Sequence, residues 1–130
     1  MKVLLDTHLL LWAAGNPMRL APATRALIEA DDTELLFSAA SVWEIGIKNA
    51  MGRDDFRIDP RAFRAALLGN DYTELSITGE HALAASALPT IHRDPFDRML
   101  VAQASIEGAT LLTADPLVGR YPGTIRLEGS

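Results

Sequence analysis

The sequence contains no cysteine and no long uninterrupted apolar run, and each absence excludes a class of protein. Without cysteine there is neither a disulfide framework nor a thiolate metal site, which favours a reducing compartment such as the cytoplasm. Asp6 and His8 break the apolar stretch near the N-terminus, so we expect neither a secretory signal nor a membrane span. Basic residues are outnumbered as well, and the net charge of −5 argues against a strongly basic nucleic-acid scaffold.

The composition is that of an ordinary globular domain. Hydrophobic residues make up 48% of the chain and charged residues 22%, which excludes an intrinsically disordered chain. A length of 130 residues fits one compact domain, and no repeat, low-complexity tract or linker divides it. We therefore predict a single domain over residues 1–130.

Apolar runs and helical patterns alternate along the chain. Strands are expected at residues 2–5, 35–38, 72–77, 109–113 and 124–127. Helices are expected among them, one ending at residue 14 and others at 21–30, 42–51, 60–68, 78–87 and 96–107. The apolar runs "VLL", "LLF" and "TLL" do not alternate with polar residues, as in strands that are covered on both faces. The order of elements predicts an α/β sandwich around a mostly parallel sheet.

Four acidic residues stand near predicted junctions between strands and helices. Asp6 interrupts the apolar segment "MKVLLDTHLLLWAA" where the first strand ends and a helix begins. Glu44 lies shortly after the second strand, Asp97 in the first turn of a helix, and Asp115 immediately after another strand. Because ligands bind at the carboxyl edge of parallel sheets, we expect all four carboxylates to lie at that edge.

Each of these acids also has a purely structural explanation. Asp6 matches a helix N-cap. Asp94-Pro95 and Asp115-Pro116 match an N-cap followed by proline at the first helical position. Ser41 and Glu44 match the spacing of a capping box, and the carboxylate of Asp97 would be stabilised by the helix dipole. Asp94 is assigned here to capping alone.

Charge repulsion favours a functional role for the remaining four. At an effective dielectric constant of about 20, two carboxylates about 4 Å apart repel by roughly 4 kcal/mol, whereas serine, threonine or asparagine would cap a helix without that cost. A divalent cation with oxygen ligands, such as Mg²⁺ or Mn²⁺, relieves the repulsion. Such a cluster suits hydrolysis of phosphodiester bonds by metal-activated water.

Four segments, in this order, resemble the PIN-domain ribonucleases and, more narrowly, the VapC toxins of bacterial toxin–antitoxin pairs. These are "LLDTHLLLWAA", "SAASVWEIGIK", "HRDPFDRMLVAQA" and "LLTADPLVGRYPG". The resemblance implies a three-layer α/β/α fold and a Mg²⁺- or Mn²⁺-dependent endoribonuclease. It assigns catalysis and metal binding to one acidic quartet: Asp6, Glu44, Asp97 and Asp115.

The resemblance also distributes roles within the quartet. Asp6 and Asp97 are the expected direct metal ligands, Glu44 either binds metal or orients water, and Asp115 either completes the pocket or holds a second ion. Thr113 is either a hydrogen-bond donor to a carboxylate or water, or an ordinary strand threonine.

Partners are implied in the same way. We expect a cognate VapB-type antitoxin, an RNA substrate, a homodimer and a toxin–antitoxin hetero-oligomer, with no membrane association. An acidic pocket would attract a basic side chain of the antitoxin.

The remaining polar and aromatic residues receive structural readings. Lys48, four residues after Glu44, is expected to form an ion pair with it on one helix face. Arg93, Arg98 and Arg120 are expected either to meet phosphates or, more simply, to balance the acids or stay solvated. The tryptophans are read as core or interface residues and the histidines as packing or surface residues: Trp12, Trp43, His8, His81 and His92. Two loops, residues 52–59 and 89–93, are candidate determinants of RNA specificity.

Two alternatives remain. A haloacid-dehalogenase-like phosphatase would use Asp6 as its nucleophile, but such enzymes show Asp-x-Asp after the first strand and this chain has Asp6-Thr7-His8. A PIN module that binds partners without catalysis is the other, and the intact acidic quartet counts against it.

Overall fold

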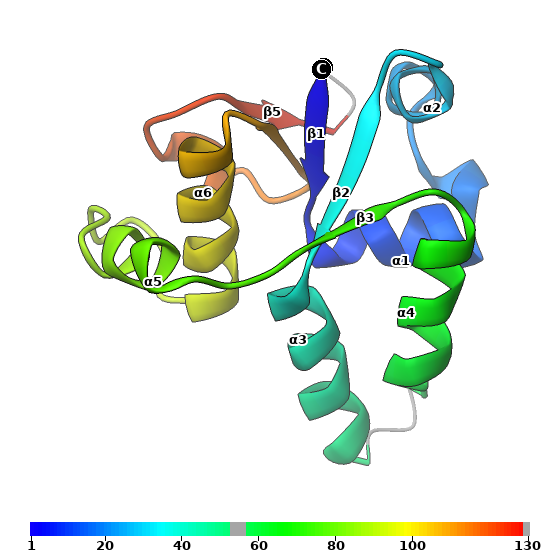
Figure 1. Ribbon diagram of the computed structural model, residues 1–130, viewed down its shortest axis with the longest axis horizontal. Helices are drawn as coiled ribbons and strands as arrows, with labels where there is room; N and C mark the ends of the chain where they lie inside the picture. Colours follow the sequence, from blue (N-terminus) through cyan, green and yellow to red (C-terminus); the bar gives the residue numbers. More distant parts are fainter. Residues whose placement is uncertain (53–56, 129–130) are drawn as a thin grey trace.

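A sheet of five parallel strands forms the centre of the computed structural model, which describes residues 1–52 and 57–128 (Figure 1). The strands follow the spatial order β3-β2-β1-β4-β5, and every pairing between neighbours is parallel. Their bounds are β1 (Lys2–Leu5), β2 (Glu34–Ser38), β3 (Thr73–Leu75), β4 (Thr110–Thr113) and β5 (Ile125–Leu127). The chain places β2 and β3 on one side of β1 and then β4 and β5 on the other. The carboxyl edge of the sheet at such a switch point is where α/β sheets bind ligands.

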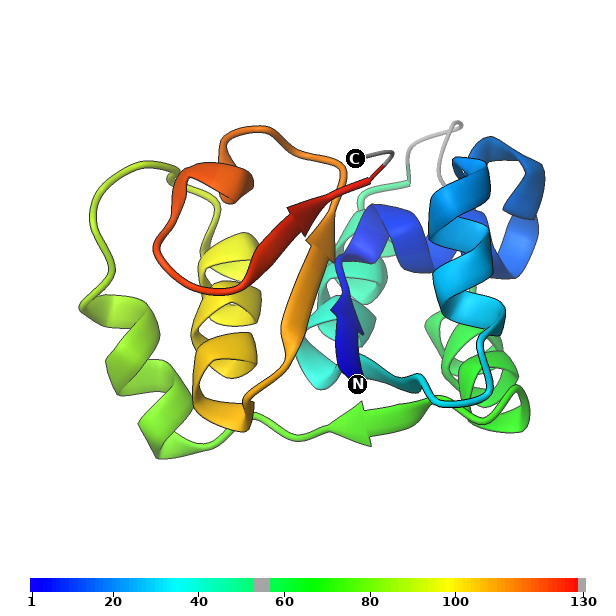
Figure 2. The ribbon, with the colours of Figure 1, turned by 90° about the horizontal axis from the view of Figure 1, so that it is seen from above.

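Helices cover both faces of the sheet. Figure 2 shows α5 and α6 on one side, and α1, α2 and α4 on the other, which confirms the expected three-layer α/β/α arrangement. The helices of the described residues are α1 (Thr7–Gly15), α2 (Pro22–Glu29), α3 (Ala39–Ala50), α4 (Pro60–Gly69), α5 (Gly79–Ser86) and α6 (Pro95–Glu107), with 3₁₀ turns η1 (Pro17–Arg19) and η2 (Val118–Arg120). None of these helices has the length and apolar character needed to cross a membrane.

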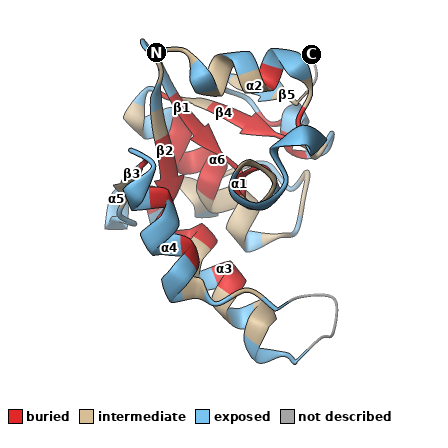
Figure 3. Cartoon of the chain, turned by 90° about the vertical axis from the view of Figure 1, so that its right-hand side faces the viewer, coloured by how far each residue is buried: buried red, intermediate tan, exposed pale blue. Residues whose placement is uncertain are grey.

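The apolar strands supply the centre of two cores, one on each face of the sheet. Successive residues of a strand point to opposite faces. Val3 and Leu5 therefore pack with residues of α1 and α4, whereas Leu4 packs with residues of α6. Figure 3 shows the burial concentrated along β1, β2 and β4, with exposed residues on the outer helices. The prediction that both faces are covered is confirmed.

Most predicted elements agree with the structure to within a few residues. The third strand is shorter than its predicted span of 72–77, and the predicted irregular segment after β4 contains the short turn η2. The largest difference concerns α3, which begins at Ala39 rather than at Val42. Ser38 ends β2 and caps α3 by accepting a 3.0 Å hydrogen bond from the backbone N–H of Ala40. Part of the predicted loop 52–59 lies outside the described residues.

Candidate active site at the carboxyl edge of the sheet

Strands β1 and β2 run toward the edge of the sheet at which α1, α3 and α6 begin (Figure 1). Asp6 directly follows β1, and Asp115 follows β4 by two residues. Glu44 lies inside α3 and Asp97 in the first turn of α6. The four predicted acids are therefore carried by elements that meet at one edge.

Asp6 is buried, and three donors of the protein hold its carboxylate. Oδ1 accepts a 2.9 Å hydrogen bond from the backbone N–H of Leu9, which confirms that Asp6 caps α1. Oδ2 accepts from the Thr113 hydroxyl at 2.6 Å and from the backbone N–H of Ala114 at 3.0 Å. Burial raises the pKa of Asp6, and these hydrogen bonds act in the opposite direction. A carboxylate oxygen accepts about two hydrogen bonds, so Oδ1 retains room for a further partner.

Glu44 is buried within α3 and contacts the first residue of α1. The Thr7 hydroxyl donates to its Oε1 at 2.7 Å and also lies 2.9 Å from the Ser41 hydroxyl. The predicted ion pair with Lys48 is confirmed, since Nζ lies 2.9 Å from Oε2. The predicted capping box of Ser41 and Glu44 is wrong, because Ser38 caps the helix and both residues lie inside it. The spacing matched a capping box, but β2 runs directly into α3 three residues earlier.

Asp94 and Asp97 occupy the start of α6. Asp94 caps the helix, as predicted, by accepting from the backbone N–H groups of Phe96 at 2.8 Å and Asp97 at 3.3 Å. Burial raises the pKa of Asp97 to about 7, and the negative charges of Asp94, Asp6 and Glu44 contribute in that order. One carboxylate oxygen of Asp94 and one of Asp97 can be chosen within 4.8 Å of each other, so these two acids share the start of the helix.

His92, to which the sequence assigned no role, contacts two of the predicted acids. Its Nε2 lies 3.0 Å from Asp97 Oδ2 and 3.4 Å from Asp115 Oδ2. His92 lies outside any helix or strand, five residues before Asp97, at a spacing that matches no metal motif. What the sequence does show is that His92 lies in an irregular segment directly before Asp94 and Asp97, at the start of a helix.

Asp115 is the most exposed member of the quartet. Its Oδ1 accepts a 2.9 Å hydrogen bond from the backbone N–H of Leu117, and its own N–H donates to the Thr113 hydroxyl at 3.1 Å. The cap-plus-proline pattern therefore closes a turn, because no helix begins at Pro116. Thr113 joins the two strand ends by contacting both Asp6 and Asp115, which confirms the hydrogen-bonding reading of this threonine.

Arg98 has a structural role that the sequence analysis did not consider. Its guanidinium donates to the carbonyl oxygens of Ala85 at 2.9 Å, Leu88 at 3.1 Å and Pro89 at 3.0 Å. Five donors in a planar fork suit this arrangement. Sequence reasoning had no access to it, because the carbonyls belong to the last turn of α5 and to the irregular segment that follows it.

The two tryptophans, expected to be core or interface residues, differ in burial. Trp43 is 64% exposed and contacts Phe96 edge to face, with ring centroids 5.3 Å apart, so it is not a core residue. Trp12 is partly buried against the core, and the guanidinium of Arg19 lies 4.5 Å from the centre of its ring.

The chemistry of the donor set fits a divalent cation. One ligand atom from each of His92, Asp94 and Asp97 can be chosen so that these atoms lie within 4.8 Å of one another. The charges of Asp6 and Glu44 also raise the pKa of Asp97, and Asp115 Oδ2 lies 3.4 Å from the same His92 nitrogen. Hard carboxylate oxygens, with one imidazole nearby, are ligands that Mg²⁺ or Mn²⁺ accepts.

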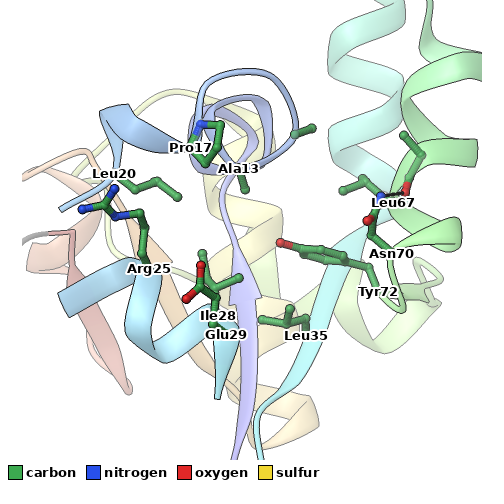
Figure 4. A pocket seen from close by; sticks show the side chains of 12 residues that line it. Ala13, Pro17, Leu20, Arg25, Ile28, Glu29, Leu35, Leu67, Asn70 and Tyr72 are labelled. Atoms are coloured by element: carbon green, nitrogen blue, oxygen red, sulfur yellow. Dashed lines mark hydrogen bonds between the residues drawn. The ribbon is translucent and has the colours of Figure 1, made fainter. Parts of the chain in front are cut away.

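A separate hollow of about 330 Å³ lies away from these acids (Figure 4). Helices α1, α2 and α4 and strand β2 enclose it, and Tyr72, Leu67, Ile28 and Leu20 line it together with Arg25 and Glu29 of α2. None of the four predicted acids lines this hollow, so the acidic edge of the sheet is the candidate active site.

The sequence and the fold are similar to those of known proteins. The family described as PIN domain matches residues 3–123. Ribonuclease VapC22 of Mycobacterium tuberculosis is 34% identical over 114 residues, which cover 87% of this chain and 86% of that protein.

Three solved structures share the fold at low identity. A chain of VapBC2 from Rickettsia felis, bound to a DNA fragment from their promoter, has a TM-score of 0.73 at 14% identity and covers 98% and 99% of the two chains. A chain of DNA-bound VapBC from Salmonella typhimurium has a TM-score of 0.63 at 19% identity, covering 98% and 97%. One of VapBC-1 from nontypeable Haemophilus influenzae has a TM-score of 0.56 at 21% identity, covering 88% and 87%.

Proposed function

Because this chain belongs to the PIN domain family, with a ribonuclease of the VapC type among its relatives, we propose that it is a Mg²⁺- or Mn²⁺-dependent endoribonuclease. It acts as the toxin of a toxin–antitoxin pair and hydrolyses phosphodiester bonds of RNA in the cytoplasm. The family match supports this function over a haloacid-dehalogenase-like phosphatase, for which only the position of Asp6 argued.

The observation that carries the proposal is geometric: ligand atoms of His92, Asp94 and Asp97 lie within 4.8 Å of one another, and His92 Nε2 lies 3.4 Å from Asp115 Oδ2. In keeping with this geometry, burial and the charges of three further acids, two of them from other elements of the fold, raise the pKa of Asp97 to about 7. A cluster that served only as caps would not need to bring these charges together. Bound Mg²⁺ or Mn²⁺ would neutralise the cluster, lower the pKa of a bound water and stabilise charge on the leaving oxygen.

The residues of the chain divide the remaining work. Asp97 and Asp6 are the proposed direct ligands. Two donors of the protein occupy Asp6 Oδ2 and one occupies Oδ1, so Oδ1 is the oxygen that can bind a further partner. Thr7 and Lys48 hold the two oxygens of Glu44, so Glu44 either contributes a further ligand or orients water. Asp115, tied to Thr113 and close to His92, completes the outer side of the cluster.

A VapB-type antitoxin is the proposed partner, since three chains of similar fold come from VapBC structures. A basic side chain of that partner would find the acidic cluster attractive. A homodimer is proposed as well, because Trp43, Ile47 and the C-cap residue Met51 expose apolar surface at intervals of four residues on one side of α3.

Cleavage of RNA by the purified, antitoxin-free chain tests the function directly. We expect cleavage in Mg²⁺ or Mn²⁺ and none in EDTA, and its loss in Asp6→Asn and Asp97→Asn. Asp59→Asn is the matched control, because Asp59 caps α4 in an exposed position and asparagine caps equally well. Equal cleavage by wild type and both cluster variants would place the activity elsewhere or in a contaminant. No cleavage by the wild type would instead favour a PIN module that binds without catalysis.

A further inference from the structure

We propose that Tyr121 is a positioning residue of the acidic site, which acts by holding His92 so that the imidazole orients Asp97 and Asp115 for metal binding. The proposal rests on the metal-binding role assigned to the cluster above. It gives a role at the site to two residues of the quoted segments to which the sequence analysis assigned none.

The first observation is that one hydroxyl satisfies both backbone groups of His92. The N–H of His92 donates to the Tyr121 hydroxyl oxygen at 2.8 Å, and that hydroxyl donates back to the His92 carbonyl at 3.0 Å. Arg98 Nη1 lies 3.3 Å from the same oxygen. The hydroxyl thus uses its single proton and accepts two hydrogen bonds, so its whole bonding capacity is used on the segment before α6.

The second observation is that His92 depends on such support. It belongs to no helix or strand, so its backbone polar groups take part in no ladder of regular hydrogen bonds. The preceding residues are held by Arg98 through three carbonyl groups, and Tyr121 takes over at His92 itself. Tyr121 is anchored in turn, because its ring is 4% exposed within the core between the sheet and α6.

The third observation is where this support places the imidazole. His92 Nε2 lies 3.0 Å from Asp97 and 3.4 Å from Asp115, which come from α6 and from the turn after β4. A donor between two carboxylates fixes their orientation. Groups that orient metal ligands in this way typically affect metal affinity or activity by 10- to 100-fold when they are removed.

Binding of Mn²⁺ to the full antitoxin-free chain, measured from the electron paramagnetic resonance signal of free Mn²⁺, tests the proposal without relying on cleavage. We expect Tyr121→Phe and His92→Leu to weaken Mn²⁺ binding by about tenfold. His92→Gln should stay within about threefold of wild type, because an amide nitrogen can donate from the place of Nε2.

Tyr72→Phe is the matched control. Tyr72 is also a buried tyrosine, at 8% exposure, but it lines the hollow away from the cluster, and its hydroxyl hydrogen-bonds to no group in the described part of the chain. We expect this variant to bind Mn²⁺ as the wild type does. Equal binding by Tyr121→Phe and Tyr72→Phe would overturn the positioning role.

If Tyr121→Phe folds poorly, the comparison of His92→Leu with His92→Gln still tests the proposal. His92→Gln binding as weakly as His92→Leu would mean that the imidazole itself ligates the metal, which contradicts an orienting role. The same samples are tested for RNA cleavage. A wild-type chain that binds Mn²⁺ but cuts no RNA contradicts the proposed function, whereas the comparison of Mn²⁺ affinities still decides the role of Tyr121.

Discussion

The Thr113 hydroxyl donates a 2.6 Å hydrogen bond to Asp6 Oδ2, joining two residues that are 107 positions apart in the sequence. Both side chains are buried at the ends of neighbouring parallel strands, β1 and β4. The same threonine oxygen accepts from the backbone N–H of Asp115. One hydroxyl therefore connects two members of the acidic quartet.

Thr113→Val should lower the free energy of unfolding by about 2 kcal/mol, because a buried hydrogen bond to a charged group is lost while the side-chain shape is kept. Urea denaturation at pH 8 measures the change. The control is Thr110→Val, at the partly exposed start of the same strand, with an expected change below about 0.5 kcal/mol. Equal effects of the two substitutions would show that the bond to Asp6 contributes nothing specific.

The raised pKa of Asp97 predicts that the metal-free protein loses stability as the pH rises. Between about pH 4 and 7 the folded state retains the proton and the unfolded state, with the ordinary pKa of 3.8, has lost it. The folded state binds more protons in this window, so the free energy of unfolding falls with increasing pH.

Asp97→Asn should remove this penalty and raise the stability of the metal-free protein at pH 8 by about 2 kcal/mol, with little change at pH 4. Thermal unfolding in EDTA at several pH values measures the difference. Asp59→Asn at the start of α4 should change the stability neither at pH 8 nor at pH 4. A variant less stable than wild type at pH 8 would contradict the repulsion inferred at the cluster.

Divalent metal should stabilise the protein most where the cluster is fully ionised. At 100 times the dissociation constant, a ligand that binds only the folded state adds about 2.7 kcal/mol. We expect Mn²⁺ to raise the melting temperature at pH 8, to raise it less at pH 6, and to have little effect on Asp97→Asn. EDTA should reverse the shift, and an equal shift in the variant would place the bound ion away from Asp97.

Arg98 should contribute to the stability of the protein rather than bind the phosphates of RNA. Arg98→Lys keeps the charge but cannot reach the carbonyls of Ala85, Leu88 and Pro89 together, so we expect a loss of about 2 kcal/mol in urea denaturation. Arg120→Lys, on the exposed turn η2, should cost less than about 0.5 kcal/mol. If the two substitutions cost the same, the three carbonyl contacts carry no weight.

The fold was accessible from the sequence because its signals are local. Unbroken apolar runs mark strands buried on both faces, and Gly108 or an Asp-Pro pair marks where helices end or begin. The error at α3 has the same origin, because Ser41 and Glu44 have the spacing of a capping box while Ser38 is an equally good cap three residues earlier. Local pattern alone could not choose between these two serines.

The sequence by itself determined the order of strands and helices and placed Asp6, Asp97 and Asp115 at their junctions, since these follow from residues adjacent along the chain. Only the tertiary structure decided that His92 lies between Asp97 and Asp115, that Tyr121 holds it, and that Arg98 serves three carbonyls. The physical reason is that such contacts join irregular segments to distant elements. Their partners are selected by how the sheet packs against α6, and no periodicity in the sequence records that packing.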